Sequence, residues 1–163
     1  MTIIADASSL ILLAKVSVLE EFSRRNTIVI PKSVYEEVIN GKEKGRLDSL
    51  LVENLTQNNL LKIKTPERRV KNRIENLFNI KKGELDVIAL AYKTKDTVLS
   101  DDKKCFNTAK VLSIGFITSL DVVVVLCKKG HITKEKLHEC LERLEEYGWY
   151  SKNIIKMYRG CLK

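Results

Sequence analysis

Short apolar runs alternate with longer amphipathic stretches along the 163 residues, and this alternation predicts the order of strands and helices. Runs rich in β-branched residues are typical of strands, and we expect strands at residues 2–5, 27–30, 61–63, 97–99 and 116–118. Apolar residues three or four positions apart are typical of helices. We expect helices at residues 8–22 with a break near 15–17, and at 32–40, 45–60, 66–78, 84–95, 103–112, 121–128, 133–147 and 151–160.

The stretch from Asp121 to Lys128 is the ambiguous one, because Val122 to Val125 also has strand propensity. We assign it to a buried helix, since it lies just before Gly130. Gly41 is expected to end the helix over residues 32–40. Strands that alternate with helices predict an α/β fold in which a parallel, twisted β-sheet is sandwiched between α-helices.

The length of the chain suits one hydrophobic core, and no repeat, low-complexity tract or linker divides it. We expect a single domain over residues 1–163, with a C-terminal helical extension from about residue 131. The apolar run from Leu10 to Ala14 is too short for a leader or a membrane span. We therefore expect a cytoplasmic protein without membrane contact.

The net charge of +8 favours a polyanionic partner such as RNA, because Lys and Arg contacts to phosphate release counterions. The four cysteines form no C-x-x-C pair, which argues against a zinc site and favours reduced, structural thiols. The sequence also lacks the spacing of a P-loop or of a dinucleotide-binding glycine motif. With two histidines, both near the C-terminus, a Ser-His-Asp triad is disfavoured.

Acidic residues follow the predicted strands at their carboxyl ends. Asp6 follows the first strand, and Asp101 and Asp102 follow the fourth, while Glu37 and Glu84 lie in helices that start near the same edge. Ligands bind at this edge in open parallel sheets. Carboxylates held close together destabilise the fold unless a cation neutralises them, and Mg²⁺ or Mn²⁺ prefers such oxygen ligands. An ion bound there would activate water for phosphodiester hydrolysis.

Each acid also has a structural explanation. Asp6 suits the N-cap of the following helix, and Asp101 or Asp102 suits a turn or an N-cap. Glu84 suits the positive end of a helix dipole, although its spacing from Val87 and Ile88 points it inward.

Neighbouring acids are assigned structural roles by the same reasoning. Ser33 and Glu36 fit a capping box, which leaves Glu37 for the site. Asp86 shares its side of the helix with less apolar residues, so we place it at the surface. Asp121 is an N-cap or an additional acid of the site, and the N-cap is the commoner role.

Four motifs occur in an order that resembles the PIN domain family. Each follows a predicted strand or opens a predicted helix. The motifs are Ile3-Ile-Ala-Asp6-Ala-Ser8-Ser-Leu-Ile, Ile30-Pro31-Lys-Ser-Val-Tyr-Glu-Glu37-Val, Lys82-Gly83-Glu84-Leu-Asp-Val-Ile-Ala-Leu-Ala91 and Val98-Leu-Ser-Asp101-Asp102-Lys-Lys. The resemblance extends to the tail around Gly148-Trp149-Tyr150, whereas Thr118-Ser-Leu-Asp121-Val-Val lacks the family's Gly-rich form.

The resemblance implies a ribonuclease that depends on a divalent metal and is often the toxin of a toxin–antitoxin pair, as in VapC-like proteins. It implies catalytic roles for Asp6, Glu37, Glu84 and Asp101, with Asp6, Glu84 and either Asp101 or Asp102 as ligands of Mg²⁺ or Mn²⁺. Glu37 would bind a second ion or orient the attacking water, and Ser8 would position a ligand. A homodimer is common in this group, and a cognate antitoxin is an expected partner.

Basic residues near the acids are candidates for contacts to the RNA backbone. They are Arg68, Arg69, Lys71, Arg73, Lys103 and Lys104. A solvated helix face explains those between 68 and 73 equally well. Single-stranded or looped RNA is the favoured substrate, because cleavage needs access to the backbone.

Three functions thus compete at the level of sequence. The first is the nuclease, and the main alternative is a non-catalytic module of the same fold that binds RNA or protein, since some members of the family are inactive. The third is a response-regulator-like receiver domain. A receiver domain would have an Asp at the end of a middle strand. It is disfavoured because the second predicted strand ends in Ile30-Pro31.

Overall fold

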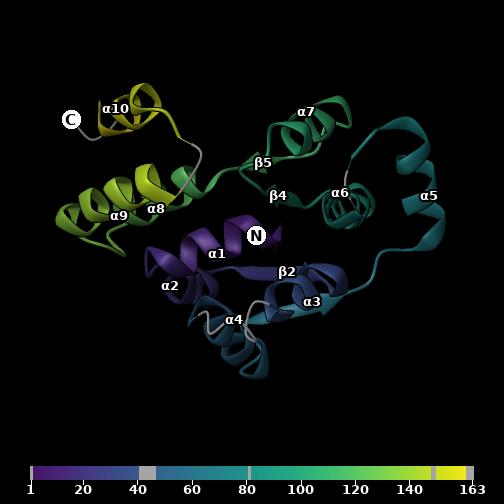
Figure 1. Cartoon of the computed structure of the whole chain (residues 1–163), viewed down its shortest axis with the longest axis horizontal. Helices are drawn as coiled ribbons and strands as arrows, with labels where there is room; N and C mark the ends of the chain where they lie inside the picture. Colours follow the sequence, from purple (N-terminus) through teal and green to yellow (C-terminus); the bar gives the residue numbers. More distant parts are fainter. Residues whose placement is uncertain (1, 41–46, 81, 148–149, 161–163) are drawn as a thin grey trace.

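Five parallel strands form one sheet at the centre of the computed structural model, which describes residues 2–40, 47–80, 82–147 and 150–160 (Figure 1). The strand order is β3-β2-β1-β4-β5. The strands are β1 (Thr2–Ala5), β2 (Thr27–Pro31), β3 (Leu61–Lys64), β4 (Thr97–Leu99) and β5 (Phe116–Ile117). The strands expected from the sequence and their parallel arrangement are therefore confirmed.

Helices flank the sheet and correspond to the predicted segments (Figure 1). They are α1 (Ala7–Lys15), α2 (Leu19–Arg25), α3 (Lys32–Asn40), α4 (Leu47–Gln57), α5 (Arg68–Leu77), α6 (Lys82–Thr94), α7 (Lys103–Val111), α8 (Ser119–Lys128), α9 (Lys134–Tyr147) and α10 (Lys152–Gly160). The ambiguous segment is helical, as α8. The expected break near residues 15–17 separates α1 from α2, with Ser17 at a φ of 60°. The expected end at Gly41 lies outside the described residues.

β1 is the central strand and sets the position of the sheet. Its neighbours β2 and β4 pair with it so that Ile4 lies beside Val29 on one side and Val98 on the other. Successive residues of a strand point to opposite faces, yet Ile3, Ile4 and Ala5 are each at most 2% exposed. Both faces of the strand are therefore covered, which explains its uninterrupted apolar sequence.

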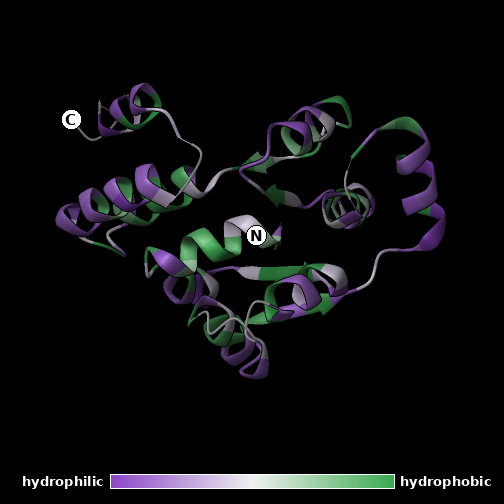
Figure 2. Ribbon diagram, in the orientation of Figure 1, coloured by the Kyte–Doolittle hydropathy of each residue, from purple (hydrophilic) through white to green (hydrophobic). Residues whose placement is uncertain are grey.

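The helices divide into buried ones and peripheral ones. Apolar residues dominate α1, whereas polar residues dominate α5 and α9 (Figure 2). In α8, Val122, Val124 and Leu126 are buried within the chain, while Val125 is 45% exposed. Most of this apolar run is thus core, which leaves little of it for contact with a second copy. Within the described residues, no helix is long and apolar enough to cross a membrane.

Side-chain caps begin three of the helices and fix the loops that lead from the strands. Asp6 caps α1 by accepting from the Ser9 amide, and Asp102 caps α7 by accepting from the Cys105 amide. Thr118 and Asp121 form a capping box at the start of α8. The N-cap role considered for Asp6 and Asp102 is therefore present, whereas the N-cap of α8 is Thr118 and not Asp121. For Asp6 and Asp102, the cap also fixes the acid at the carboxyl edge of the sheet.

Candidate active site

The acids after β1 and β4 lie side by side because these strands are neighbours. Ala5 pairs with Leu99 in the sheet, and the Asp6 amide donates to the Leu99 carbonyl at 3.1 Å. Beyond this pair, Asp6 follows β1, and Ser100, Asp101 and Asp102 follow β4. The sheet register therefore joins two acidic segments that are more than ninety residues apart in sequence.

A pocket of about 380 Å³ lies at this edge, and four of the five predicted acids line it. The four come from separate elements: the end of β1, α3, α6 and the end of β4. The lining residues are Asp6, Ala7, Ser8, Ile11, Val34, Glu37, Gly83, Glu84 and Asp102. The folded chain thus assembles the predicted acidic constellation in one cavity.

Asp6 is the most buried acid of the pocket, at 5% exposure. Its Oδ1 accepts from the Ser9 amide at 2.8 Å and from the Ser8 hydroxyl at 3.2 Å, and its Oδ2 accepts from the Ser100 hydroxyl. Burial, with a smaller contribution from the nearby charge of Asp101, raises the pKa of Asp6 to about 6, although the hydrogen bonds from Ser100 and Ser9 oppose both effects. The ionised form of Asp6 would therefore gain from a nearby cation.

Glu37 of α3 lies against the first turn of α6, which carries Glu84. A β-carbon added at Gly83 would lie 3.3 Å from Oε2 of Glu37, so the glycine leaves room for that carboxylate against the first turn of α6. Glu37 is exposed on its helix, and Glu84 is half-buried in the first turn of α6. A carboxylate is favourable at that end of a helix dipole.

The adjacent acids Asp101 and Asp102 face different surroundings. Asp102 lines the pocket while its Oδ1 accepts from the Cys105 amide at 2.8 Å. Asp101 is not among the residues that line the pocket. It accepts from the Ser9 hydroxyl at 2.8 Å, from the Ser119 amide at 2.9 Å and hydroxyl at 2.5 Å, and from the Tyr150 hydroxyl.

The partners of Asp101 were missed by sequence reasoning. Ser9 and Ser119 lie in the first turns of α1 and α8, and Tyr150 lies between α9 and α10. Their hydroxyls carry no spacing signal that separates them from the other hydroxyl side chains of the sequence. Ser100 was detectable in principle, because a serine between a buried strand and two acids is positioned to bond to them.

The prediction that Asp86 lies at the surface is wrong. Its residue exposure is 5%, the Lys71 ammonium lies 2.5 Å from its Oδ1, and the Ser33 hydroxyl donates to its Oδ2 at 2.5 Å. The predicted capping box of Ser33 and Glu36 is also wrong, because α3 already begins at Lys32 and the Ser33 hydroxyl bonds to Asp86. Glu36 instead lies near Lys32, with 3.7 Å between its Oε1 and the Lys32 Nζ.

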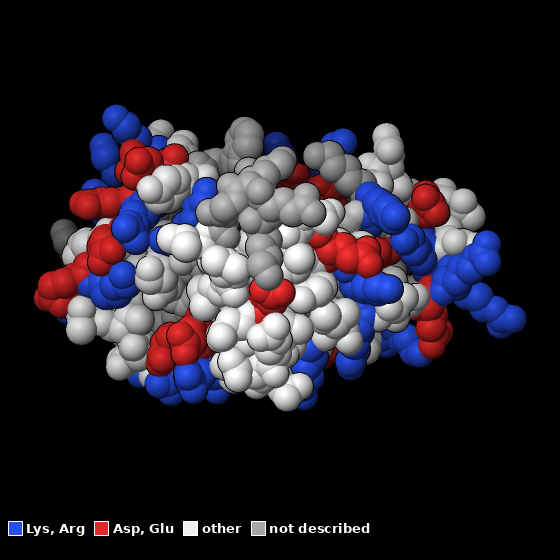
Figure 3. Space-filling view, turned by 60° about the horizontal axis from the view of Figure 1, so that its bottom comes forward, with Lys and Arg blue, Asp and Glu red and all other residues white. Residues whose placement is uncertain are grey.

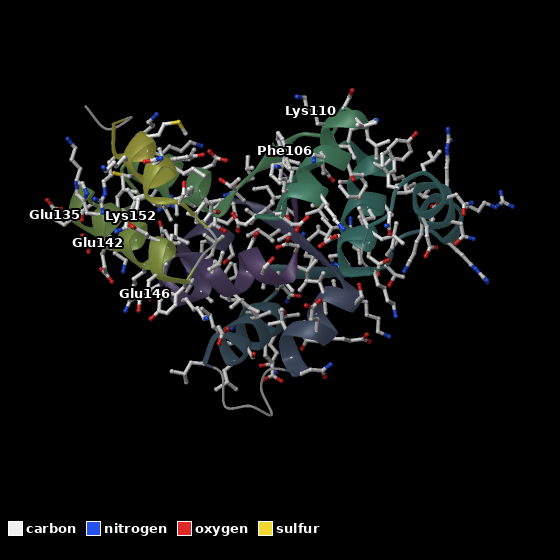
Figure 4. All side chains as sticks on the ribbon, turned by 45° about the horizontal axis from the view of Figure 1, so that its top comes forward. Phe106, Lys110, Glu135, Glu142, Glu146 and Lys152 are labelled. Atoms are coloured by element: carbon white, nitrogen blue, oxygen red, sulfur yellow. The ribbon has the colours of Figure 1, made fainter. Side chains whose placement is uncertain are left out.

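The predicted basic residues lie on two helices. Arg68, Arg69 and Arg73 are exposed on α5, and Lys103 and Lys104 are exposed in the first turn of α7, directly after Asp102. Figure 3 shows Lys and Arg side chains projecting at the end of the molecule where α5 lies. By contrast, Glu135, Glu142 and Glu146 project from α9, away from Lys110 of α7 (Figure 4). Lys71 is the exception, since its ammonium contacts Asp86.

A second pocket, of about 440 Å³, lies between α2 and α8 and contains Asp121. The carboxylate of Asp121 accepts from the Thr118 amide and hydroxyl, both at 2.8 Å, and from the Tyr158 hydroxyl at 2.7 Å. Asp121 therefore lies apart from the acidic pocket. The prediction that it is the N-cap is wrong, because Thr118 is the N-cap of α8 and Asp121 is the third residue of the helix, where it completes the capping box.

The chemistry of the acidic pocket suits a hard divalent cation. Its donors are carboxylate oxygens, and one of them belongs to a buried acid whose ionised form is disfavoured by burial. Among the described residues, no three side chains of the His, Cys, Asp and Glu types are close enough to share an ion directly. The acids would hold an ion through bridging waters or after moving closer together.

This arrangement defines a class of α/β proteins with an acidic pocket at the carboxyl edge of a parallel sheet. The particular family follows from comparison with known proteins, since the family model described as a PIN domain matches residues 2–159. The chain belongs to this family.

Two curated relatives are similar to parts of the chain. Endoribonuclease Nob1 of Pyrococcus abyssi is 29% identical over 82 residues, which cover 46% of this chain and 51% of that protein. Ribonuclease VapC1 of Thermoplasma acidophilum is 26% identical over 99 residues, which cover 56% of this chain and 47% of that protein. The aligned part of the chain thus spans about half the length of these relatives.

Proposed function

We propose that the protein is an endoribonuclease that hydrolyses RNA phosphodiester bonds with the help of Mg²⁺ or Mn²⁺. The observation that carries this proposal is the pocket in which Asp6, Glu37, Glu84 and Asp102 converge from four separate elements. Membership of the PIN domain family and similarity to two ribonucleases support the same activity.

The acids of the pocket have distinct roles in this proposal. Asp6, Glu84 and Asp102 hold the cation, and Glu37, which is more exposed, binds a second ion or orients the attacking water. When bound, the ion supplies an activated water and stabilises the leaving oxygen. Ser8 and Ser100 orient the Asp6 carboxylate through their hydrogen bonds.

Asp101, the alternative ligand, has a supporting role in this proposal. Its two carboxylate oxygens accept from four donors, which come from α1, the start of α8 and Tyr150. A carboxylate held in this way is suited to fixing the end of β4, and it leaves Asp102 as the acid of that segment that borders the pocket.

In this proposal, basic residues of two helices hold the RNA. We assign backbone contacts to Arg68, Arg69 and Arg73 of α5, and to Lys103 and Lys104, which follow Asp102 directly. Lys71 is less suited to this role, because its ammonium lies 2.5 Å from a buried carboxylate. These contacts are to phosphate and therefore do not select a sequence.

Cleavage of a mixed pool of structured and unstructured RNAs tests the proposal. The chain is assayed with Mn²⁺, with Mg²⁺ and with chelator, beside Asp6→Asn and Glu84→Gln. We expect cleavage with metal that chelator abolishes, and a loss of about a hundredfold or more in each variant, as for removal of other electrostatic stabilisers. RNA binding without cleavage, unchanged by these replacements, would instead support a non-catalytic binding module.

Two matched pairs of variants separate the roles of neighbouring acids in the same assay. Glu37→Gln should lower the cleavage rate strongly, whereas Glu36→Gln, one residue away and close to Lys32, should not. Asp102→Asn should resemble Asp6→Asn, while Asp101→Asn should retain more activity. The reverse order for Asp101 and Asp102 would show that Asp101 is the ligand.

The biological role expected from the family resemblance is part of the proposal. We infer that the chain is the toxin of a toxin–antitoxin pair, with an antitoxin that blocks RNA cleavage, and that it acts in the cytoplasm as a homodimer. Growth of cells that express the chain is the readout for the toxin role. Sedimentation of the purified chain measures the oligomeric state, and a monomer would remove the dimer from the proposal.

A further inference from the structure

We propose that Asp86 is a positioning residue that fixes α3 and α5 on α6 and thereby places Glu37 in the acidic pocket. The inference rests on the proposed nuclease function, in which Glu37 is part of the reacting site. Asp86 does not line the pocket, so it acts through the residues that it contacts.

The first contact joins α6 to α3. The Ser33 hydroxyl donates to Oδ2 of Asp86 at 2.5 Å, and the serine is partly buried. Ser33 lies one helical turn before Glu37, so the two side chains project from the same side of α3. The hydrogen bond at Ser33 therefore fixes the rotation of α3 about its own axis, which directs Glu37 toward the acidic pocket.

The position of Glu37 shows what this rotation achieves. Its Oε2 lies where a β-carbon at Gly83 would be only 3.3 Å away, and Gly83 lies almost one turn before Asp86 on α6. The two helices thus meet at two successive levels, Ser33 with Asp86 and Glu37 with Gly83. A shift at the first level would displace Glu37 from the helix end that carries Glu84.

The second contact joins α6 to α5. The Lys71 ammonium lies 2.5 Å from Oδ1 of Asp86, and its side chain is 26% exposed against 7% for Asp86. The helices α5 and α6 lie beside each other (Figure 1). The Lys71 ammonium therefore places a positive charge directly beside the buried carboxylate. Asp86 therefore anchors the helix that carries Arg68, Arg69 and Arg73.

Removal of Asp86 itself is a poor test, because it would leave Lys71 without its buried partner and endanger the fold. Ser33→Ala breaks only the bond to α3, and Ser33→Thr restores a hydroxyl. Lys93→Met is the matched control, because it removes an exposed ion pair with Glu67 that also joins α6 to the start of α5.

Three measurements on the whole chain test the inference: the NMR signals of the Gly83 amide and the Glu37 carboxyl carbon, the affinity for Mn²⁺, and kcat and KM for RNA. In Ser33→Ala we expect both NMR signals to shift. The affinity for Mn²⁺ or the kcat for RNA should fall about tenfold, as it does when other residues that orient ligands are replaced. The KM for RNA should change little. Ser33→Thr should recover most of the loss, and Lys93→Met should behave as wild type.

The outcomes separate this inference from the proposed function. Unchanged NMR signals and unchanged kcat in Ser33→Ala would overturn the positioning role, and so would an equal effect of Lys93→Met. A wild-type chain that cleaves no RNA would overturn the proposed function. In that case the NMR signals still decide whether Asp86 positions Glu37, because they require neither metal nor substrate.

Discussion

Asp6 combines two roles that place opposite demands on one side chain. As the N-cap of α1 it accepts from the Ser9 amide, which favours its ionised form. As a buried acid beside Asp101 it is harder to ionise, and the net result is a pKa raised to about 6. The fold therefore holds Asp6 in a position that is unfavourable for its charge until a cation is bound.

The raised pKa of Asp6 predicts how stability depends on pH in the metal-free protein. The pKa rises from an ordinary value of 3.8 to about 6 on folding, so the folded state retains the proton more readily. The free energy of unfolding should therefore fall as pH rises from about 4 to above 6, by on the order of 3 kcal/mol. Urea unfolding with chelator at several pH values measures this.

Two comparisons sharpen the test of this pH dependence. Asp6→Asn should flatten the slope between about pH 4 and pH 6, whereas Glu36→Gln should keep it. Mn²⁺ should raise the stability of the wild-type chain most above pH 6, because binding favours the ionised acid. A slope that persists in Asp6→Asn would assign it to another group.

At the same scale, sequence reasoning found the acids but not all of their surroundings. Asp6, Glu84 and Asp102 were detectable because each follows a strand or opens a helix at one sheet edge, whereas Glu37 lies in the middle of α3 and was identified through the family resemblance. Asp86 was misplaced, since helical spacing describes one helix and not the neighbours that pack on it. Its partners Ser33 and Lys71 belong to other helices.

At the scale of elements, α5 is a basic helix with four Lys or Arg residues. Its exposed residues include Arg68, Arg69 and Arg73, while Ile74 is 1% exposed and packs into the core. The helix is therefore held by Ile74, by Val70, which is partly buried against the core, and by the ion pair of Lys71 with Asp86. Its arginines remain exposed at the surface, which suits contact with a polyanion.

Replacement of these three arginines by alanine should reduce the salt dependence of RNA binding. Each phosphate contact on single-stranded RNA contributes about 0.7 to the slope of log K against log salt, so three lost contacts reduce it by about 2. Fluorescence anisotropy of a labelled single-stranded RNA, with chelator present, measures the slope. Alanine at Lys134, Lys152 and Lys156 of α9 and α10 removes equal charge and should leave the slope nearly unchanged.

Secondary structure was the part of the fold most accessible from the sequence. The buried strands are apolar without interruption, and helices such as α9 show clear spacing, because the packing against both faces of the sheet imposes these patterns. Residues 121–128 were predicted to be helical because they precede Gly130, and not because of their propensity. It is helical because a capping box begins it and three of its valines face the core.

At the scale of the whole molecule, a chain that cleaves RNA as a toxin should arrest the growth of its host. Induced expression of the wild-type chain should stop growth within a few generations, and Asp6→Asn expressed at an equal level should not. Optical density and the size distribution of cellular RNA measure the two effects. Normal growth despite cleavage by the purified chain would reject the toxin role and leave the nuclease in place.

The acidic pocket also has a consequence for synthesis of the chain on the ribosome. Asp6 enters the nascent chain more than ninety residues before its neighbours Ser100 and Asp102, and β1 cannot pair with β4 before these later residues are made. At about 5–20 residues per second, translation separates these events by roughly 5–20 s. A growing chain therefore carries no assembled pocket until β4 has been made. Under the proposed function, it would not be able to cleave its own messenger during that interval.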